Sequence, residues 1–270
     1  MAKNIVIVYL DIGTGNVVRN RLGRIIVYAK GVLGLSKRDI VLVSFPKSGN
    51  TWVRFVINNY ISLSELNGKI VTFSSLDQVM PEFGVNDLLK PWPYKSMPRF
   101  VKTHWAWKPL FAGKKSLLIV RDPRDTMVSY YNYRSKQVSA VNPESFQTFI
   151  RDKKFGLEAW FKHLKSWEKK ATCVIRYEDL KRDGLKEISD SLQKLSLDIN
   201  TEILSMAFDN AAFDKLKANE QIHGMSKMNF FSGGQMFFNK GKTNQWVEYF
   251  SERDLEYYQE LKSKYRLNAY

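Results

Sequence analysis

The chain has 270 residues, 44% of them hydrophobic and 26% charged, and it carries a formal net charge of +15. This composition is typical of a globular protein, and the length suits a single α/β domain with a sizeable core. No apolar run approaches the roughly 18 residues of a membrane-spanning helix, so we expect no stable membrane insertion.

The cysteine content and the N-terminal residues indicate the cellular compartment of the protein. Cys173 is the only cysteine, so no intrachain disulfide can form, which fits a reducing environment. The apolar run at residues 4–10 is short for a signal-peptide core and is followed directly by Asp11. We therefore expect a cytoplasmic protein.

The positive charge has three explanations: a nucleic-acid partner, a membrane surface, or a site for a highly anionic small molecule. Basic residues are spread along the whole chain, with a dense early group among aliphatic residues at positions 17–38. We interpret this stretch as a basic amphipathic helix docked on the domain, with a membrane-surface role as the alternative. The basic members of the group are Arg19, Arg21, Arg24, Lys30, Lys37 and Arg38.

Short apolar runs alternate with helical patterns along the rest of the chain. Strands are predicted at 40–45, 99–104, 116–120 and 172–177. Helices are predicted at 51–61, 124–136, 155–169, 185–195, 201–208 and 251–264. This order favours a central parallel sheet flanked by helices in one domain covering residues 1–270, with its core at about 39–251. Two irregular stretches, 74–98 and 223–243, are expected to lie over the site.

The segment that follows the first predicted strand is suited to an anion. Residues 46–49 form a tight turn, and a helix begins near Thr51, so the first helical N–H groups have no partner inside the helix. Lys47 adds a full positive charge, and Ser48 and Thr51 add hydroxyl donors. The lysine precedes Gly49, the only glycine of the loop, so this is not the G-x-x-x-x-G-K-[ST] loop of many ATP-binding proteins.

A second candidate anion site follows the predicted strand at 116–120. Arg121 lies at the strand's carboxyl end, Pro123 suits the first turn of a helix, and Ser129 lies two turns further on. The arginine fork matches phosphate oxygens, although an Arg–Asp pair that only organises the turn is the alternative. Together the two loops imply a ligand with anionic groups at both ends.

These two elements resemble those of the PAPS-dependent sulfotransferases, and the resemblance runs from about residue 39 to 251. It implies the P-loop-kinase-like sulfotransferase fold and the donor 3′-phosphoadenosine 5′-phosphosulfate (PAPS), with 3′-phosphoadenosine 5′-phosphate (PAP) as the product. The loop with Asn50, Thr51 and Trp52 is similar to that of bacterial members. The resemblance assigns the 5′ end of PAPS to Lys47, Ser48, Gly49, Asn50 and Thr51, the 3′-phosphate to Arg121 and Ser129, and the adenine and nucleotide faces to Trp52, Tyr177 and Phe213.

The stretch at 238–246 resembles the family motif R-K-G-x-x-G-D-W, with departures. Asn239 stands where the arginine that grips the 3′-phosphate is usual, while Lys240 and Gly241 remain. Lys242 is a candidate for the missing charge. Asn244 and Gln245 replace the usual Gly-Asp, and Trp246 is expected to pack.

The predicted strand at 99–104 ends in Lys102-Thr103-His104, which in the family supplies the catalytic base. A neutral imidazole can take the proton that an alcohol or phenol loses as it attacks sulfur. Lys47 and Lys102 are expected to stabilise the negative charge of the transition state, as in phosphoryl transfer. The resemblance implies no metal, and the sequence shows no obvious metal-binding cluster.

The acceptor is the least determined part of this interpretation. We expect a small molecule with a hydroxyl, or an amine, and do not choose between phenols, steroids, sugars, lipids and polar natural products. No nucleic-acid partner is expected, and a homodimer stays open. Candidate walls of the acceptor site are Trp92, Tyr94, Trp105, Trp107, Phe230, Phe231, Met236, Phe237 and Phe238, with His223 as a weaker candidate and His163 as a packing residue.

Two other functions remain as alternatives to a sulfotransferase of class EC 2.8.2. A P-loop-type nucleotide or small-molecule kinase would need the lysine spacing that the loop lacks and a Mg²⁺ carboxylate. A basic nucleic-acid-binding protein would explain the net charge of +15 but neither the strand-end motifs nor His104.

Overall fold

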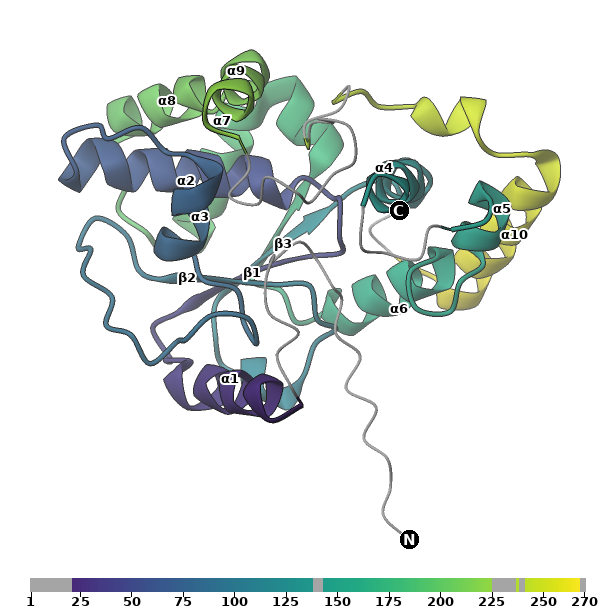
Figure 1. Cartoon of the computed structure of the whole chain (residues 1–270), viewed down its shortest axis with the longest axis horizontal. Helices are drawn as coiled ribbons and strands as arrows, with labels where there is room; N and C mark the ends of the chain where they lie inside the picture. Colours follow the sequence, from purple (N-terminus) through teal and green to yellow (C-terminus); the bar gives the residue numbers. More distant parts are fainter. Residues whose placement is uncertain (1–20, 138–142, 225–236, 238–240, 268–270) are drawn as a thin grey trace, which may run out of the picture.

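The computed structural model describes residues 21–137, 143–224, 237 and 241–267. In these residues a central parallel sheet of four strands has the order β2-β1-β3-β4 and is flanked by helices (Figure 1). The strands are β1 (Ile40–Ser44), β2 (Phe100–Thr103), β3 (Ser116–Val120) and β4 (Cys173–Arg176), each within a residue or two of its predicted position. The predicted α/β architecture is confirmed.

Burial explains why the strands read as continuous apolar runs. Every residue of β1, β2 and β3 is buried, as expected for parallel strands covered on both faces. β4 lies at the sheet edge, and Val174 and Arg176 on this strand are exposed.

The parallel register brings the strand ends together. Val43 of β1 lies opposite Thr103 of β2 and Leu118 of β3, and Val120 lies opposite Arg176. The segments that follow the strands therefore meet at the carboxyl edge of the sheet, where open α/β sheets bind ligands.

Alternate residues of β1 reach two separate cores. Ile40 and Leu42 pack with the helices on one face, and Val41 and Val43 pack with those on the other. The first face is covered by α2 (Asn50–Glu65), α7 (Tyr177–Lys194) and α8 (Thr201–Asn210). The second is covered by α4 (Pro123–Ser135), α6 (Leu157–Trp167) and α10 (Glu252–Tyr265).

Three helices and two boundaries differ from the sequence predictions. The unpredicted helices are α3 (Phe73–Val79), α5 (Phe146–Ile150) and α9 (Phe213–His223), and 3₁₀ turns lie at Pro109–Phe111 and Gln245–Glu248. The stretch at 74–98 was expected to be irregular, but it begins inside α3. Helix α7 begins at Tyr177, whereas the predicted helix begins at 185. The first turns were not predicted because a break at Asp183 (φ −149°, ψ 64°) separates them from the rest of the helix.

The predicted basic helix forms α1 (Arg21–Gly34) and docks on the domain. The Tyr28 ring stacks on Trp105 with centroids 5.5 Å apart, and Gly31 packs against Phe83. Lys30 forms an ion pair with Asp87 at 2.6 Å. The part of the predicted helix before residue 21 lies outside the described residues.

Candidate active site

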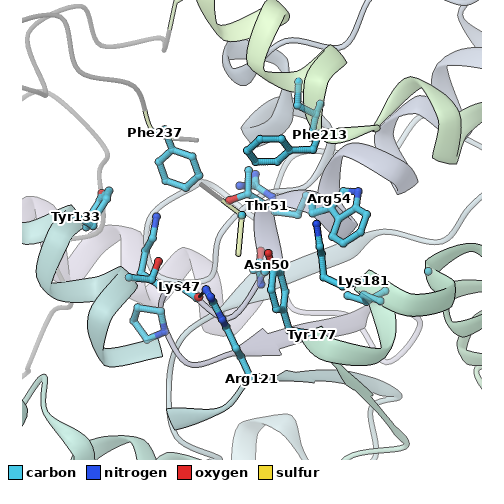
Figure 2. A pocket seen from close by; sticks show the side chains of 18 of the residues that line it. Lys47, Asn50, Thr51, Arg54, Arg121, Tyr133, Tyr177, Lys181, Phe213 and Phe237 are labelled. Atoms are coloured by element: carbon cyan, nitrogen blue, oxygen red, sulfur yellow. Dashed lines mark hydrogen bonds between the residues drawn. The ribbon is translucent and has the colours of Figure 1, made fainter. Parts of the chain in front are cut away.

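A cavity of about 570 Å³ opens at the carboxyl edge of the sheet. Its lining comes from the segments after all the strands of the sheet described above, together with parts of α2, α3 and α9 (Figure 2). The predicted site residues that lie on it are Lys47, Gly49, Asn50, Thr51, Trp52, Lys102, His104, Arg121, Ser129, Tyr177, Phe213 and Gly241.

The loop after β1 is a tight turn that delivers the start of α2 to the cavity. Lys47 (φ 67°) and Gly49 (φ 100°) both adopt left-handed backbone conformations, and Gly49 is the N-cap of the helix. A Cβ atom on Gly49 would lie 2.6 Å from the Tyr177 ring, so the close approach of α7 requires glycine. The first N–H groups of α2 have no partner within the helix and favour an anion.

The Lys47 ammonium lies against aromatic faces inside the cavity. Its Nζ atom is 3.7 Å from the Phe237 ring centroid and 4.4 Å from that of Tyr133 (Figure 2). Burial, and then the charge of Arg121, lower the pKa of Lys47 to about 7. Near neutral pH this group therefore exists in both its charged and its neutral form.

Two buried donors support an anion at this loop. Within the described residues, Ser48 Oγ and Arg121 Nε are buried without a hydrogen-bond partner. Buried polar groups are nearly always satisfied, so such donors fit a ligand that carries acceptor oxygens, although Ser48 itself does not line the cavity. Asn50 instead braces the loop, because its Nδ2 donates to Ser44 Oγ at 3.2 Å.

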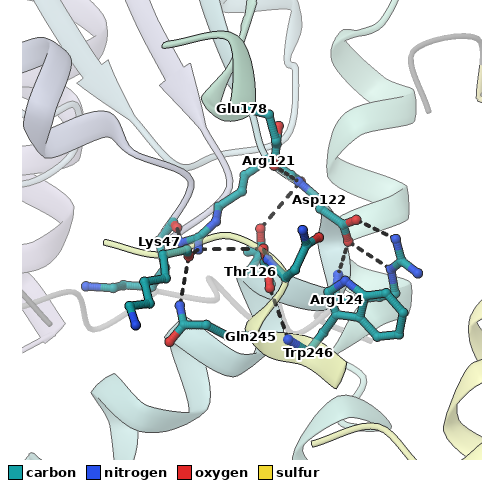
Figure 3. Close-up of polar contacts among 11 residues, drawn as sticks. Lys47, Arg121, Asp122, Arg124, Thr126, Glu178, Gln245 and Trp246 are labelled. Carbon is teal, nitrogen blue, oxygen red and sulfur yellow. Dashed lines mark hydrogen bonds and ion pairs between the residues drawn. The ribbon is translucent and has the colours of Figure 1, made fainter. Parts of the chain in front are cut away.

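Arg121 joins three separate parts of the site. Its guanidinium donates to the carbonyl oxygens of Lys47 at 3.3 Å and Lys242 at 3.0 Å, and lies 4.4 Å from the Tyr177 ring centroid. Figure 3 shows this guanidinium between the loop after β1 and the segment that carries Gln245. Burial raises the pKa of Tyr177, so this ring stays neutral.

Asp125 is a site residue that the sequence interpretation missed. Its buried carboxylate accepts the N–H groups of Asn244 at 2.7 Å and Trp246 at 3.1 Å, and lies 4.0 Å from the Arg121 guanidinium. It thereby anchors the 242–246 segment beside Arg121. The spacing of four residues from Arg121, in the first turn of a helix, was the available signal.

The 242–246 segment accommodates its departures from the family motif. Asn244 adopts the left-handed conformation (φ 60°) that a glycine takes easily and that asparagine tolerates. The Arg124 guanidinium packs on the Trp246 ring, with its Cζ atom 3.9 Å from the ring centroid. The side chain of Lys242 is exposed. Asn239 and Lys240 lie outside the described residues, so their roles stay predictions.

The residues expected at the nucleotide base gather near one another. Trp52 lies edge-on to Tyr177, at 6.4 Å between centroids, and packs on Phe208 at 5.8 Å. Phe213 contacts the backbone at Gly241 (φ 58°), where a Cβ atom would lie 2.9 Å from its ring. Both Trp52 and Phe213 line the cavity, so these two rings reach the same space.

His104 is held in a single tautomer. Its Nδ1 lies 2.8 Å from the carbonyl oxygen of Ser44, which can only accept, so Nδ1 carries the proton. Burial, and then the charge of Lys102, lower the pKa of His104 well below its usual value. The ring is therefore neutral at pH 7, and Nε2 carries a lone pair that can take a proton.

Lys102 is paired with a carboxylate that the sequence interpretation did not include. Its ammonium forms a buried ion pair with Glu82 at 2.7 Å, and both side chains line the cavity. Backbone hydrogen bonds hold the two residues side by side. Lys102 N–H donates to the carbonyl oxygen of Pro81 at 2.9 Å, and Phe83 N–H donates to the carbonyl oxygen of Lys102 at 2.8 Å. Glu82 was missed because it lies in a stretch without periodicity.

A second ion pair closes the cavity wall. Arg54 donates to Asp77 at 2.6 Å and to the carbonyl oxygen of Met80 at 3.1 Å. Both charged side chains line the cavity beside the apolar residues Phe73 and Leu76.

Several aromatic residues expected around the acceptor pack elsewhere. Trp92 and Tyr94 pack against the core on the α2 face of the sheet, Trp105 lies against Tyr28, and Trp107 lies beneath the Lys170 ammonium. Phe237 does line the cavity. Phe230, Phe231, Met236 and Phe238 lie outside the described residues.

The other histidines lie apart from the cavity lining. His163 is buried with its ring edge-on to Phe45, as expected for a packing residue, and burial lowers its pKa to about 4. His223 was expected in a loop, but it lies exposed in the last turn of α9, because the helical stretch continues up to Gly224.

Across the described ranges, no cluster of three or more His, Cys, Asp or Glu side chains is arranged to hold a metal ion. Nor does any helix among the described residues combine the length and hydropathy needed to cross a bilayer.

Comparisons with known proteins point to one family. Residues 37–265 match the family model described as the sulfotransferase domain. Sulfotransferase 6B1 of Danio rerio is 32% identical over 245 residues, covering 83% of this chain and 76% of the relative. Sulfotransferase 1C2 of Homo sapiens is 27% identical over 246 residues, covering 83% and 81%.

Solved structures share the fold. Mouse sulfotransferase SULT7A1 complexed with PAP superposes with a TM-score of 0.66 at 23% identity, covering 90% of this chain and 92% of that one. Retinol dehydratase in complex with androsterone and inactive cofactor PAP gives 0.67 at 18% identity, covering 90% and 86%. With a family match over most of its length, the chain belongs to the sulfotransferase family.

Proposed function

We propose that the protein transfers the sulfuryl group of PAPS to a hydroxyl, or an amine, of a small-molecule acceptor and releases PAP. One observation carries the proposal: a neutral His104 shares one cavity with a lysine–arginine anion site. The relatives are named sulfotransferases, and two structural neighbours hold PAP, which supports the same donor here.

The donor end of the cavity comprises residues 47–52 with Arg121 and Tyr177. Ser48, Thr51 and the N–H groups at the start of α2 would bind the 5′-phosphosulfate, and Lys47 would add charge. Arg121 and Ser129 would bind the 3′-phosphate. Trp52 and Phe213 would hold the adenine. The buried donors Ser48 Oγ and Arg121 Nε fit these roles.

The acceptor end comprises His104, Lys102 and Glu82. The acceptor oxygen forms a bond to sulfur while the bond between sulfur and the 5′-phosphate oxygen breaks, and the acceptor proton passes to Nε2 of His104. Lys47 stabilises the charge that develops on the sulfuryl and phosphate oxygens. Lys102 is neutralised by Glu82 at 2.7 Å, so we assign it a smaller electrostatic role than Lys47.

The cavity limits the acceptor in size more than in chemistry. A volume of about 570 Å³ must hold both the nucleotide and the acceptor, which favours a small molecule. Apolar residues Phe73 and Leu76 lie beside the ion pairs, so an acceptor with one apolar and one polar side is the best fit. We place the enzyme in the cytoplasm, where the buried Cys173 thiol would remain reduced.

The kinase alternative is not favoured by the comparisons, which return sulfotransferases. Nor does the loop after β1 have the lysine spacing of a Walker A motif.

Donor binding and transfer can be tested separately. PAP at millimolar concentration should raise the melting temperature, because it binds only the folded state. The turnover of labelled PAPS with a panel of phenols, alcohols and amines should identify the acceptor class. No shift with PAP and no transfer to any acceptor would contradict the proposal.

The role of His104 needs a matched histidine control. His104→Ala should lower kcat by about 100- to 10,000-fold, the usual contribution of a general base, and leave the Kd of PAP within about twofold. His223→Ala, which changes an exposed histidine, should leave kcat unchanged. Equal activity of the His104→Ala and native enzymes would remove the base assignment.

A further inference from the structure

Helix α1 presents an aliphatic face to solvent. Leu33 is 77% exposed, Leu22 is 63% exposed, and Ile25 and Ile26 are each 47% exposed. Their spacing of three, four and seven residues places them on one arc of the helix. Exposed Ala29 and Val32 lie on the same arc. We interpreted this stretch as an amphipathic helix docked on the domain, and the exposure of its aliphatic residues corrects that interpretation.

The opposite side of α1 is already used. Tyr28 stacks on Trp105 and lies edge-on to Phe83, and Gly31 is buried against Phe83. A helix that is apolar on both sides is typical of a buried position, yet α1 lies at the periphery of the molecule (Figure 1). Its outer face therefore has the composition of a binding surface.

Basic residues surround this aliphatic face. Lys37 and Arg38 lie shortly after the end of α1, and both are exposed. Exposed Lys108 lies over the Trp105 ring on which Tyr28 stacks. Exposed Lys90 adjoins the end of the helix, because Arg99 bonds to the carbonyl oxygens of both Gly34 and Lys90.

The acidic residues near α1 are already paired. Asp87 bonds to Lys30 at 2.6 Å, and Asp39 bonds to Arg99 at 2.7 Å. The surroundings of the aliphatic face are therefore cationic, and the partner that matches them must be apolar at its centre and anionic around it.

Charge complementarity decides between the candidate partners. A second copy of the chain would bring two cationic surroundings together, which is unfavourable. Residues 1–20 include an apolar run at 4–10, but they carry Lys3 and Arg19 against Asp11 and add no net negative charge. We propose that α1 binds the surface of an anionic lipid bilayer as a peripheral helix, with its aliphatic face in the headgroup–acyl boundary.

The proposal does not depend on the chemistry of the cavity. The family match begins at residue 37, so α1 lies outside the region that defines the sulfotransferase family. The contact of Tyr28 with Trp105 nevertheless joins α1 to the segment that carries His104.

Sedimentation with vesicles tests the proposal on the full chain. The protein should bind phosphatidylcholine vesicles containing 30% phosphatidylglycerol at least tenfold more strongly than pure phosphatidylcholine vesicles. Raising the salt concentration to 0.5 M should weaken the binding, because it screens the lysine and arginine charges.

Two charge-matched double variants separate the α1 face from general charge. Ile26→Glu/Leu33→Glu should lower vesicle binding at least tenfold. Met206→Glu/Ile222→Glu, at positions of α8 and α9 that are 50% and 76% exposed, should leave it unchanged. Matching melting temperatures would show that both variants are folded.

Three results would overturn the proposal. Equal vesicle binding by the two double variants would show that the α1 face is not involved. A dimer in light scattering that only Ile26→Glu/Leu33→Glu abolishes, without vesicle binding, would identify a second copy as the partner. Vesicle binding that arises only after removal of residues 2–20 would show that these residues cover the face.

Discussion

The donor end takes its donors from segments that directly follow β1 and β3, whereas the acceptor end joins β2 to a proline-rich segment by a buried ion pair. At the donor end, backbone geometry at Lys47 and Gly49 sets the site. At the acceptor end, the pairing of Glu82 with Lys102 sets it. The donor end can therefore recur wherever its short motifs recur, while the acceptor end depends on the fold of a segment that has no short motif of its own.

Glu82→Gln should have the largest effect and should act only at the acceptor end. Removing one member of a buried ion pair leaves Lys102 uncompensated and should lower the free energy of unfolding by about 3 kcal/mol. Thermal or urea unfolding measures this loss, and the Kd of PAP should stay within about twofold of the native value.

A second acid-to-amide change serves as the control for Glu82→Gln. Asp87→Asn breaks the Lys30–Asp87 pair, whose side chains are 41% and 26% exposed, and should lower stability far less than Glu82→Gln does, because solvent screens an exposed pair. Similar losses in both variants would show that the Glu82–Lys102 pair is not special.

Gly49→Ala should damage the donor end and leave the acceptor end intact. A left-handed conformation costs other residues about 1–3 kcal/mol, and the new Cβ would meet the Tyr177 ring, so PAP affinity should fall about 30-fold. Isothermal titration with PAP measures it. Gly113→Ala, at φ 71° with no atom within 4 Å of the new Cβ, should leave PAP affinity unchanged.

Asp125→Asn tests whether the 242–246 segment belongs to the donor end. Bonds to a charged group contribute about 1.5–3 kcal/mol, so weakening those from Asn244 and Trp246 should lower PAP affinity about tenfold. The acceptor KM at saturating PAPS should not change. Asp122→Asn alters the Asp122–Arg124 pair on the same turn and should leave PAP affinity within about twofold of the native value; equal losses would argue against an anchoring role.

The smallest expected effect is the pH dependence of donor binding. The pKa of Lys47 is about 7 in the free protein, and a bound anion should raise it, so binding takes up a proton above pH 7. PAP affinity should therefore fall about fivefold between pH 7 and pH 8. Titration in buffers of different ionisation enthalpy detects the proton, and Lys47→Arg should abolish the dependence. A flat profile for the native enzyme would contradict this role.

The contrast between the donor and acceptor ends also explains which parts of the site could be predicted from the sequence. Strand, loop and helix are contiguous at residues 41–52, so the cradle could be predicted from one stretch of chain. Arg121 could be placed because it follows an apolar strand. The acceptor end could not, because Glu82 and Lys102 lie 20 residues apart, and no periodicity links them.

Short and interrupted helices were the other elements that could not be predicted from the sequence. Helix α3 spans only Phe73–Val79, too little for a helical pattern to stand out. The charged first turns of α7 and its break at Asp183 conceal the start of that helix. The aliphatic face of α1 was missed for a different reason, because its residues were interpreted as part of an amphipathic helix docked on the domain.

The parallel sheet also constrains how the chain folds during synthesis. β1 pairs only with β2 and β3 among the described strands, and both follow it by more than a dozen residues and a crossover. At ordinary synthesis rates, β3 emerges roughly 4–15 s after β1. β2 emerges somewhat earlier than β3, and until then the apolar β1 has no native partner, so a ribosome stalled before residue 100 would leave an aggregation-prone nascent chain.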